Sequence, residues 1–188
     1  MKSLFLLSII LLISACSGVD TTIRSNSNQS ISLSQYSTFG FFQPLDTDVT
    51  YETLISQYLK KATINEMSNR GFVLNNENPD LLINFHSNVE NKQYVHQMPA
   101  SNRGGYYSYR GRAYYDAWLG YDTYVENYTE GTVNIDIVDR KQNKMVWEGI
   151  AVGRLSEKKQ QDMESTLQQI VTDIFTVFPI SGSNSTTP

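Results

Sequence analysis

Apolar and polar residues alternate along four stretches of the chain, and this period of two predicts β-strands. Residues 36–43 are dense in aromatics, 81–95 alternate strictly, and 133–137 repeat the alternation. Residues 145–155 return as the hairpin partner of 133–137, although two sets of apolar residues compete there for the buried face. A β-bulge near Gly149 would reconcile them.

Two longer stretches repeat their apolar residues every three or four positions, which predicts amphipathic helices. The first helix is expected over 50–70, capped by Asp48 or Thr50 and ended by Gly71 in a left-handed conformation. Its apolar face comprises Tyr51, Leu54, Ile55, Tyr58, Leu59 and Ala62. The second helix is expected over 156–178, ahead of a proline. Its apolar stripe comprises Met163, Leu167, Ile170, Val171, Ile174 and Phe178.

The order β-α-β-β-β-α predicts an α+β fold with a mixed or antiparallel β-sheet of about four to six strands. Two long helices would pack on one face of that sheet. One domain is expected over 35–180, with a Tyr- and Gly-rich insertion at 97–122. Residues 16–34 are strongly polar and predict a flexible tether, and 181–188 a disordered tail. A short edge strand within the tether stays open, because three residues alternate there: Val19, Thr21 and Ile23.

The N-terminus has the layout of an export signal over residues 1–15, with Lys2 ahead of an apolar run that is too short to span a bilayer. The segment Ile13-Ser14-Ala15-Cys16 resembles the bacterial lipobox. That resemblance implies cleavage before Cys16 and its acylation, with more than one chain for stable anchoring. The residue after it is Ser17 rather than the Asp typical of inner-membrane retention, so we expect the outer membrane, on the periplasmic side. The alternative is an ordinary secretory signal with an incidental free cysteine.

Charge and motifs exclude several classes of function. Without residues 1–15 the chain carries 14 basic and 19 acidic side chains, which gives nucleic acid no electrostatic reason to bind. We find no phosphate loop, dinucleotide fingerprint or Gly-x-Ser-x-Gly elbow, so we expect no enzyme and no cofactor. His86 and His96 lie ten residues apart without zinc-ligand neighbours, so we expect no metal site and a solvated His86.

Three further residues are interpreted as structural. Asp139 is expected to shape a hairpin turn through hydrogen bonds from its side chain to the backbone. Asp136 is expected to pair with a cross-strand cation such as Arg154 rather than to catalyse a reaction. Trp147 is expected in the core, with its indole N–H bonded to a backbone acceptor.

The insertion is the best candidate for a binding site. It combines tyrosine with glycine and arginine, a mixture that protein-binding loops use. The candidate residues are Tyr106, Tyr107, Tyr109, Arg110, Arg112, Tyr114, Tyr115 and Trp118. An envelope protein or a cell-wall glycan could be the ligand, and a loop without any ligand is the third possibility.

An ordered set of short motifs resembles the bacterial lipoprotein family catalogued as domain of unknown function 4136. The motifs are Thr38-Phe39, Pro79-Asp80-Leu81, Gly131-Thr132 to Asp139, Trp147-Glu148-Gly149 and Phe178-Pro179. The resemblance implies a periplasm-facing lipoprotein with an α+β sandwich, and it brings no established catalytic residues. We therefore expect a lipid-anchored binding or scaffolding module, or alternatively a protein that binds peptidoglycan or polysaccharide.

Overall fold

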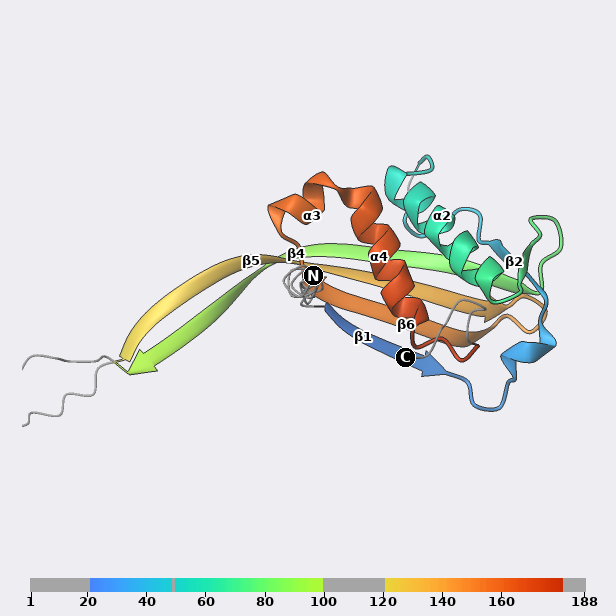
Figure 1. Cartoon of the computed structure of the whole chain (residues 1–188), viewed down its shortest axis with the longest axis horizontal. Helices are drawn as coiled ribbons and strands as arrows, with labels where there is room; N and C mark the ends of the chain where they lie inside the picture. Colours follow the sequence, from blue (N-terminus) through green and yellow to red (C-terminus); the bar gives the residue numbers. More distant parts are fainter. Residues whose placement is uncertain (1–20, 49, 100–120, 181–188) are drawn as a thin grey trace, which may run out of the picture.

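A mixed six-stranded β-sheet with helices on one face forms the centre of the computed structural model, which describes residues 21–48, 50–99 and 121–180 (Figure 1). The strands are β1 (Thr21–Ser27), β2 (Thr38–Phe41), β3 (Val73–Leu74), β4 (Leu81–Pro99), β5 (Tyr121–Asp139) and β6 (Lys144–Arg154). Their order across the sheet is β1-β6-β5-β4-β2-β3. Strand β2 runs parallel to β3 and β4, and all other neighbours are antiparallel. The predicted α+β class with a mixed sheet is confirmed.

Helix α2 (Leu54–Asn69) connects the parallel strands β2 and β4, as the strand-helix-strand order predicts. It begins later than expected, because Thr53 is the N-cap and accepts a hydrogen bond from the Ser56 backbone N–H. Its buried face is also rotated from the predicted one. Tyr51 and Leu54 are exposed, whereas the buried residues are Ser56, Leu59, Ala62, Thr63 and Met67. Gly71 follows the helix with φ of +87°, as predicted.

The C-terminal helix is divided into two, where the sequence predicts one continuous helix over 156–178. Helix α3 (Glu157–Gln161) ends at Asp162, which then caps helix α4 (Met163–Phe175) by accepting from the Ser165 backbone N–H. An aspartate favours a cap over a helix interior because its carboxylate satisfies a free N–H of the first turn. The predicted apolar stripe is confirmed, since Leu167, Val171, Ile174 and Phe178 are buried and Met163 and Ile170 pack against them. No helix in the described ranges has the length and apolarity that crossing a bilayer requires.

The prediction of a flexible tether over residues 16–34 is wrong from Thr21 onward. Residues 21–27 form the edge strand β1, which pairs antiparallel with β6 from Thr21↔Gly153 to Ser27↔Trp147. A 3-10 turn at Leu33–Gln35 follows, and Leu33 is buried in the core. The polar composition does not indicate this strand, because β1 is held at the edge of the sheet by backbone hydrogen bonds, which need few apolar side chains.

Trp147 lies at the centre of the core, with only 1% of its surface exposed. It packs edge-on against Phe178, with the ring centroids 4.9 Å apart. Gly149 makes this position available, because a Cβ at residue 149 would overlap the Trp147 ring and Ile174. The indole Nε1 has no hydrogen-bond partner among the described residues, so the expected backbone acceptor is not found there.

The predicted β-bulge exists but lies nearer the hairpin turn than Gly149. Ile137 pairs with Trp147 and Val138 with Met145, which leaves Val146 as the additional residue on β6. Both Val146 and Trp147 are buried as a result, and this explains the competing apolar patterns in the sequence.

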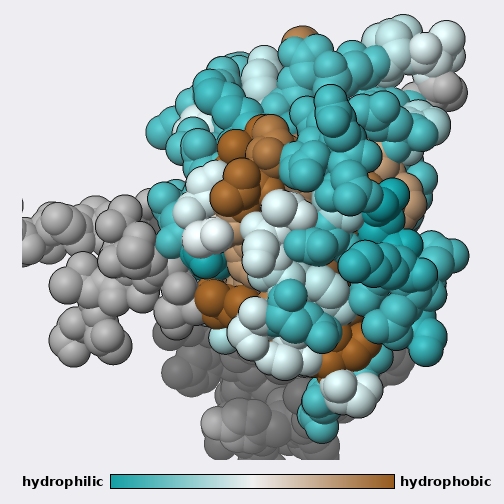
Figure 2. Space-filling view, turned by 90° about the vertical axis from the view of Figure 1, so that its right-hand side faces the viewer, coloured by the Kyte–Doolittle hydropathy of each residue, from teal (hydrophilic) through white to brown (hydrophobic). Residues whose placement is uncertain are grey.

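Strands β4 and β5 continue well beyond the rest of the sheet as a two-stranded ribbon (Figure 1). We call this ribbon, residues 91–99 and 121–129, the arm, and the remaining described residues the body. The strand predicted over 81–95 therefore continues to Pro99, and β5 begins at Tyr121 rather than at Val133. At the other end of the body, hydrophobic residues form separate patches on a largely hydrophilic surface (Figure 2).

Candidate functional site

The predicted lipidation site, Cys16, and the residues predicted to bind a ligand or partner fall outside the described ranges. They are Cys16, Tyr106, Tyr107, Tyr109, Arg110, Arg112, Tyr114, Tyr115 and Trp118. Residues 100–120 connect the end of β4 to the start of β5. The described parts of the insertion, 97–99 and 121–122, belong to strands of the arm.

The arm has two edges without strand partners among the described residues. Strand β2 pairs with β4 only at residues 81–83, and β6 pairs with β5 only from Glu130 onward. All backbone pairing along residues 91–99 is therefore with 121–129. Such free edges offer N–H and C=O groups to another chain, and a two-stranded ribbon alone is only marginally stable in water.

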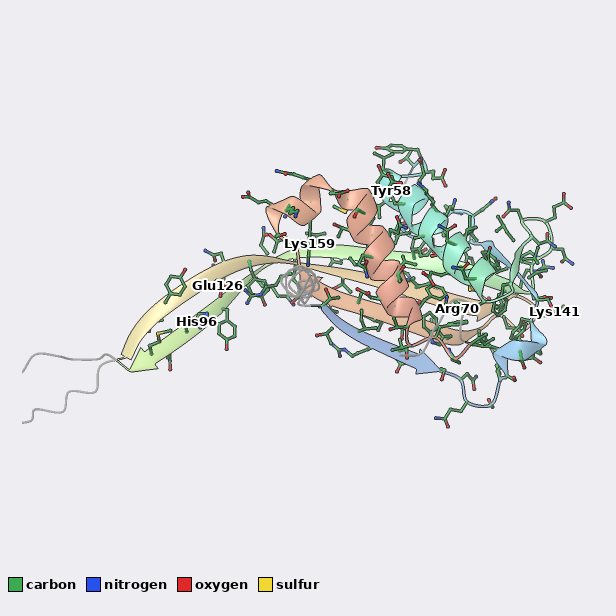
Figure 3. All side chains as sticks on the ribbon, viewed as in Figure 1. Tyr58, Arg70, His96, Glu126, Lys141 and Lys159 are labelled. Atoms are coloured by element: carbon green, nitrogen blue, oxygen red, sulfur yellow. The ribbon has the colours of Figure 1, made fainter. Side chains whose placement is uncertain are left out.

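One face of the arm is held by its own side chains. It continues the sheet face that lies opposite the helices, and we call it the open face. Its residues in the arm are Lys92, Tyr94, His96, Met98, Tyr124, Glu126 and Tyr128. Glu126 accepts from Arg154 at 2.7 Å and lies 3.1 Å from Nε2 of His96 (Figure 3). These contacts hold the pKa of Glu126 below its usual range, with the His96 hydrogen bond as the largest cause.

Aromatic contacts reinforce the open face. The ring of His96 lies 4.5 Å from that of Tyr94 and 6.0 Å from that of Tyr124, between centroids. The Arg154 guanidinium lies 4.2 Å from the centre of the Tyr128 ring, a cation–π distance. Lys92 pairs with Glu130 at the root of the arm. Charges and rings on this face thus have partners within the same chain.

His86 lies between two carboxylates on the open face of the body. Its Nδ1 is 3.1 Å from Asp46 and its Nε2 is 3.0 Å from Asp136. His86 is exposed, as expected, and it also has these two carboxylate partners; the predicted pairing of Asp136 with Arg154 is wrong, because Arg154 binds Glu126 instead. Asp46 lies in the loop after β2, so the sequence offers no periodic signal for this cluster.

The bridge from Asp46 through His86 to Asp136 requires an additional proton. A neutral imidazole has one N–H, so it can donate to only one of two flanking carboxylates. Burial raises the pKa of Asp136, while the neighbouring His86 acts in the opposite direction. A protonated imidazole, or a proton on Asp136, satisfies both contacts. The bridge joins the loop after β2 to the middle of the sheet.

Asp139 behaves as predicted and shapes the hairpin turn. It accepts from the Gln142 backbone N–H at 2.8 Å, and this bond together with the Tyr36 hydroxyl lowers the pKa of Asp139. Tyr36 donates to Asp139 at 2.7 Å. Burial, followed by this hydrogen bond, raises the pKa of Tyr36 to about 12. The group anchors the chain before β2 to the β5–β6 turn.

A groove of about 470 Å³ lies between the sheet, helix α4 and the residues around α3. Its apolar lining includes Val89, Val133, Ala151, Leu155, Met163 and Leu167. Lysines and aspartates stand at its rim rather than converging on one point. Within the described residues, no group of three or more His, Cys, Asp or Glu side chains could hold a metal ion.

Comparison with known proteins identifies the family. The sequence model described as "Domain of unknown function (DUF4136)" matches residues 23–180, most of the chain. The chain belongs to the DUF4136 family. No curated protein matches it.

A solved structure shares the fold of this DUF4136 domain at low sequence identity. A PDZ domain protein from Parabacteroides distasonis is 12% identical with a TM-score of 0.52, over 87% of this chain and 38% of that one. The chain thus spans little more than a third of that protein. Two dodecamers of PelC from Paraburkholderia phytofirmans have TM-scores of 0.43 and 0.42, at 12% and 11% identity. Each covers 82% of this chain and 96% of the PelC chain.

The short motifs that mark the DUF4136 sequence have structural roles here. Asp80 accepts from the backbone N–H groups of Ser37 and Thr38 and from the Thr38 hydroxyl, and its own N–H donates to that hydroxyl. These bonds join the Thr-Phe and Pro-Asp-Leu motifs across β2 and β4 and lower the pKa of Asp80, with the Ser37 bond as the largest cause. The motif at Trp147 and Gly149 builds the core. These motif residues therefore stabilise the fold, and the arm contains none of them.

Proposed function

We propose that this DUF4136 protein is a lipid-anchored cell-envelope lipoprotein, facing the periplasm from the outer membrane. It acts without catalysis, as a binding or scaffolding module. The arm is the observation that carries the proposal. A ribbon whose two edges have no strand partner in the described part of the chain, and which extends beyond a well-packed body, is suited to contact another molecule rather than to stabilise its own domain.

The short distance between Cys16 and β1 supports a position close to the membrane. Five peptide steps separate Cys16 from Thr21, so an extended chain spans at most about 17 Å. A tether reaching to residue 34 would span about 60 Å. The domain is thus held near the bilayer, which raises its effective concentration toward other molecules there.

The anchor is tested by metabolic labelling with a radioactive or clickable palmitate. We expect label in the wild-type protein and none in Cys16→Ala, because the thiol is the site of acylation. Envelope fractionation should place the labelled protein in the outer membrane. A wild-type protein without label, or one that keeps residues 1–15, would contradict the anchor.

The binding role is tested by photo-crosslinking in intact cells. A photoreactive residue at Tyr94 or at Val95, one on each face of the arm, should give discrete higher-mass products from at least one of the two positions. The same residue at Ser34, on the exposed surface of the body, serves as the control and should give none. Equal labelling from both regions would argue against the arm as the contact.

A glycan ligand is the second candidate, and the aromatic group on the open face favours it. Tyr94, His96 and Tyr124 present adjacent rings there, and aromatic faces stack on apolar faces of sugar rings. Binding of the purified protein to isolated sacculi would be measured for the wild type and for Tyr94→Ala with Tyr124→Ala. Retention that is unchanged in the double variant would exclude these rings as the glycan contact.

A further inference from the structure

The second face of the arm, which continues the helix-covered side of the sheet, carries no charged side chain. We call it the neutral face. It comprises Asn91, Gln93, Val95, Gln97, Thr123, Val125, Asn127 and Thr129 of the arm, together with Val89 of the body, which precedes them on the same side of the ribbon. The register between β4 and β5 has no interruption, so these alternate residues share one side of the ribbon. Lys92, His96 and Glu126 are all on the opposite side.

The neutral face exposes valines that the body does not cover. Val89, Val95 and Val125 are 61%, 52% and 45% exposed, and Val95 pairs directly with Val125 across the ribbon. One hydrogen bond between side chains is found on this face within the described residues, from Thr129 to Asn91 at 3.0 Å. The open face is satisfied internally, whereas the neutral face leaves its apolar and amide groups to solvent or to a partner.

We propose that the neutral face is a self-association surface, on which the arms of two copies of this chain pack against each other. The proposal rests on the proposed function of the arm as a binding element and names its partner. A two-fold contact sets residue i against residue j and j against i, so it leaves no charge unpaired where every charge has an opposite at the matching position or where the surface carries none. A face without charges meets this condition, and every charge of the arm stays outside the contact.

The chemistry of the neutral face does not suit other partners. Nucleic acid and anionic headgroups require cations, which this face lacks. Hydrocarbon would leave the amides of Gln93 and Asn127 without hydrogen bonds. Sugar rings stack on aromatic side chains, and Tyr94, Tyr124 and Tyr128 lie on the opposite face. A second ribbon offers both β-branched side chains and amide partners.

The size of the surface indicates where the association occurs. From residue 89 to 97 the face is about 27 Å long, and two strands make it about 10 Å wide. Its area of about 270 Å² is well below the ~800 Å² that each partner contributes to a typical stable complex. We therefore expect a weak contact that becomes populated when both copies are confined to one membrane.

The test uses the full-length protein in its membrane, with a photoreactive phenylalanine analogue introduced at Val95. Tyr124, on the open face nearby, is the matched position. Irradiation should yield a product of twice the protein's mass from Val95, with at least about a tenfold lower yield from Tyr124. A differential tag on two co-produced copies would identify the product as a homodimer.

Charge variants test the same contact in a second way, with the photoreactive phenylalanine analogue placed at Val125. Val95→Glu should lower the homodimer yield by about tenfold or more, because a like charge would then lie on both copies of an uncharged contact. Val95→Thr keeps a neutral β-branched side chain and should retain the yield. Met98→Glu adds the same charge to the open face and should leave the yield unchanged, which excludes an effect of net charge alone.

Other results would overturn the proposal. Crosslinks from Val95 to a different protein alone would reject self-association and keep the binding role of the arm. The absence of any product from either face would reject both proposals. Equal homodimer yields from Val95 and Tyr124, or a yield that Val95→Glu does not lower, would show that the neutral face is not the contact.

Discussion

The body and the arm share the strands β4 and β5, yet the two halves of each strand follow different rules. In the body, Leu81, Ile83 and Phe85 of β4 are fully buried under the helices. In the arm, Tyr94 and Val95 of the same strand are about half exposed. The backbone register is identical in both halves, so the difference lies in what covers the strands.

This difference separates the residues that stabilise the fold from the residues that are proposed to contact a partner. The DUF4136 motif residues hold the body together, through Asp80 with Thr38 and through Trp147 with Gly149. The arm depends on surface ion pairs and aromatic contacts, which contribute little stability individually. Variants in the body should therefore affect unfolding, and variants in the arm should affect association.

The largest expected effect is in the core of the body. Trp147→Ala removes a fully buried indole and leaves a cavity beside Phe175 and Phe178, which should cost about 3–5 kcal/mol of unfolding free energy. Chemical denaturation of the detergent-solubilised full chain, followed by circular dichroism, measures it. Tyr124→Ala on the arm is the control and should cost less than about 0.5 kcal/mol. Similar losses of unfolding free energy from both variants would contradict the difference between the body and the arm.

Asp80→Asn should have the second largest effect, about 1–3 kcal/mol, because a charged acceptor of three hydrogen bonds is lost. The folded state lowers the pKa of Asp80, so its contribution is complete above the unfolded pKa of about 3.9 and is lost as the pH falls through the lower folded value. The difference between wild type and variant should accordingly shrink in acid. Glu77→Gln, on the exposed turn before it, is the control. A difference that is constant with pH would reject the charge as the cause.

Asp136 should show the opposite dependence on pH. Burial raises its pKa in the folded state, so the ionised form destabilises the fold, and that penalty is relieved as the pH falls toward the folded value. Asp136→Asn cannot ionise, so wild type should gain stability relative to the variant as the pH falls from neutrality toward the folded pKa of Asp136. Thermal unfolding of wild type and variant, measured at a series of pH values from neutral to acid, tests this dependence, with Glu157→Gln on α3 as a surface control. If wild type instead loses stability relative to Asp136→Asn as the pH falls, burial does not raise the pKa of Asp136.

Local pattern predicted those parts of the body that local forces determine. Gly71 after α2, the turn at Asp139 and the stripe of α4 each depend on residues close in sequence. The rotated face of α2 could not be predicted in this way. Ser56 and Thr63 are buried there, and Ser56 finds partners in Asp48 and Thr47, which the helical period does not include.

The outer half of β5 and the histidine bridge escaped prediction for a related reason. Along Thr123 to Thr129 the alternation is between two kinds of polar surface, so it lacks the contrast of apolar and polar residues that marks a strand. Asp46 meets His86 across a loop, and no spacing in the sequence encodes that contact. The sequence thus places the candidate site in the insertion at 97–122, whereas the proposals rest on the ribbon of β4 and β5 that leads into it.

Removing the arm should have the smallest effect on the body. In this variant an Asn-Gly turn joins Asn91 directly to Thr129, which face each other across the ribbon. Among the described residues, the body keeps its core and every motif contact and loses only surface pairs, so its unfolding free energy should change by no more than about 0.5 kcal/mol. Calorimetry of the full-length and shortened proteins gives that comparison, and crosslinking in the membrane should show that the homodimer is lost. A shortened protein with a much lower unfolding free energy would mean that the arm is needed to fold the domain, and not only for association. A shortened protein that is equally stable and equally associated would move the contact to the body.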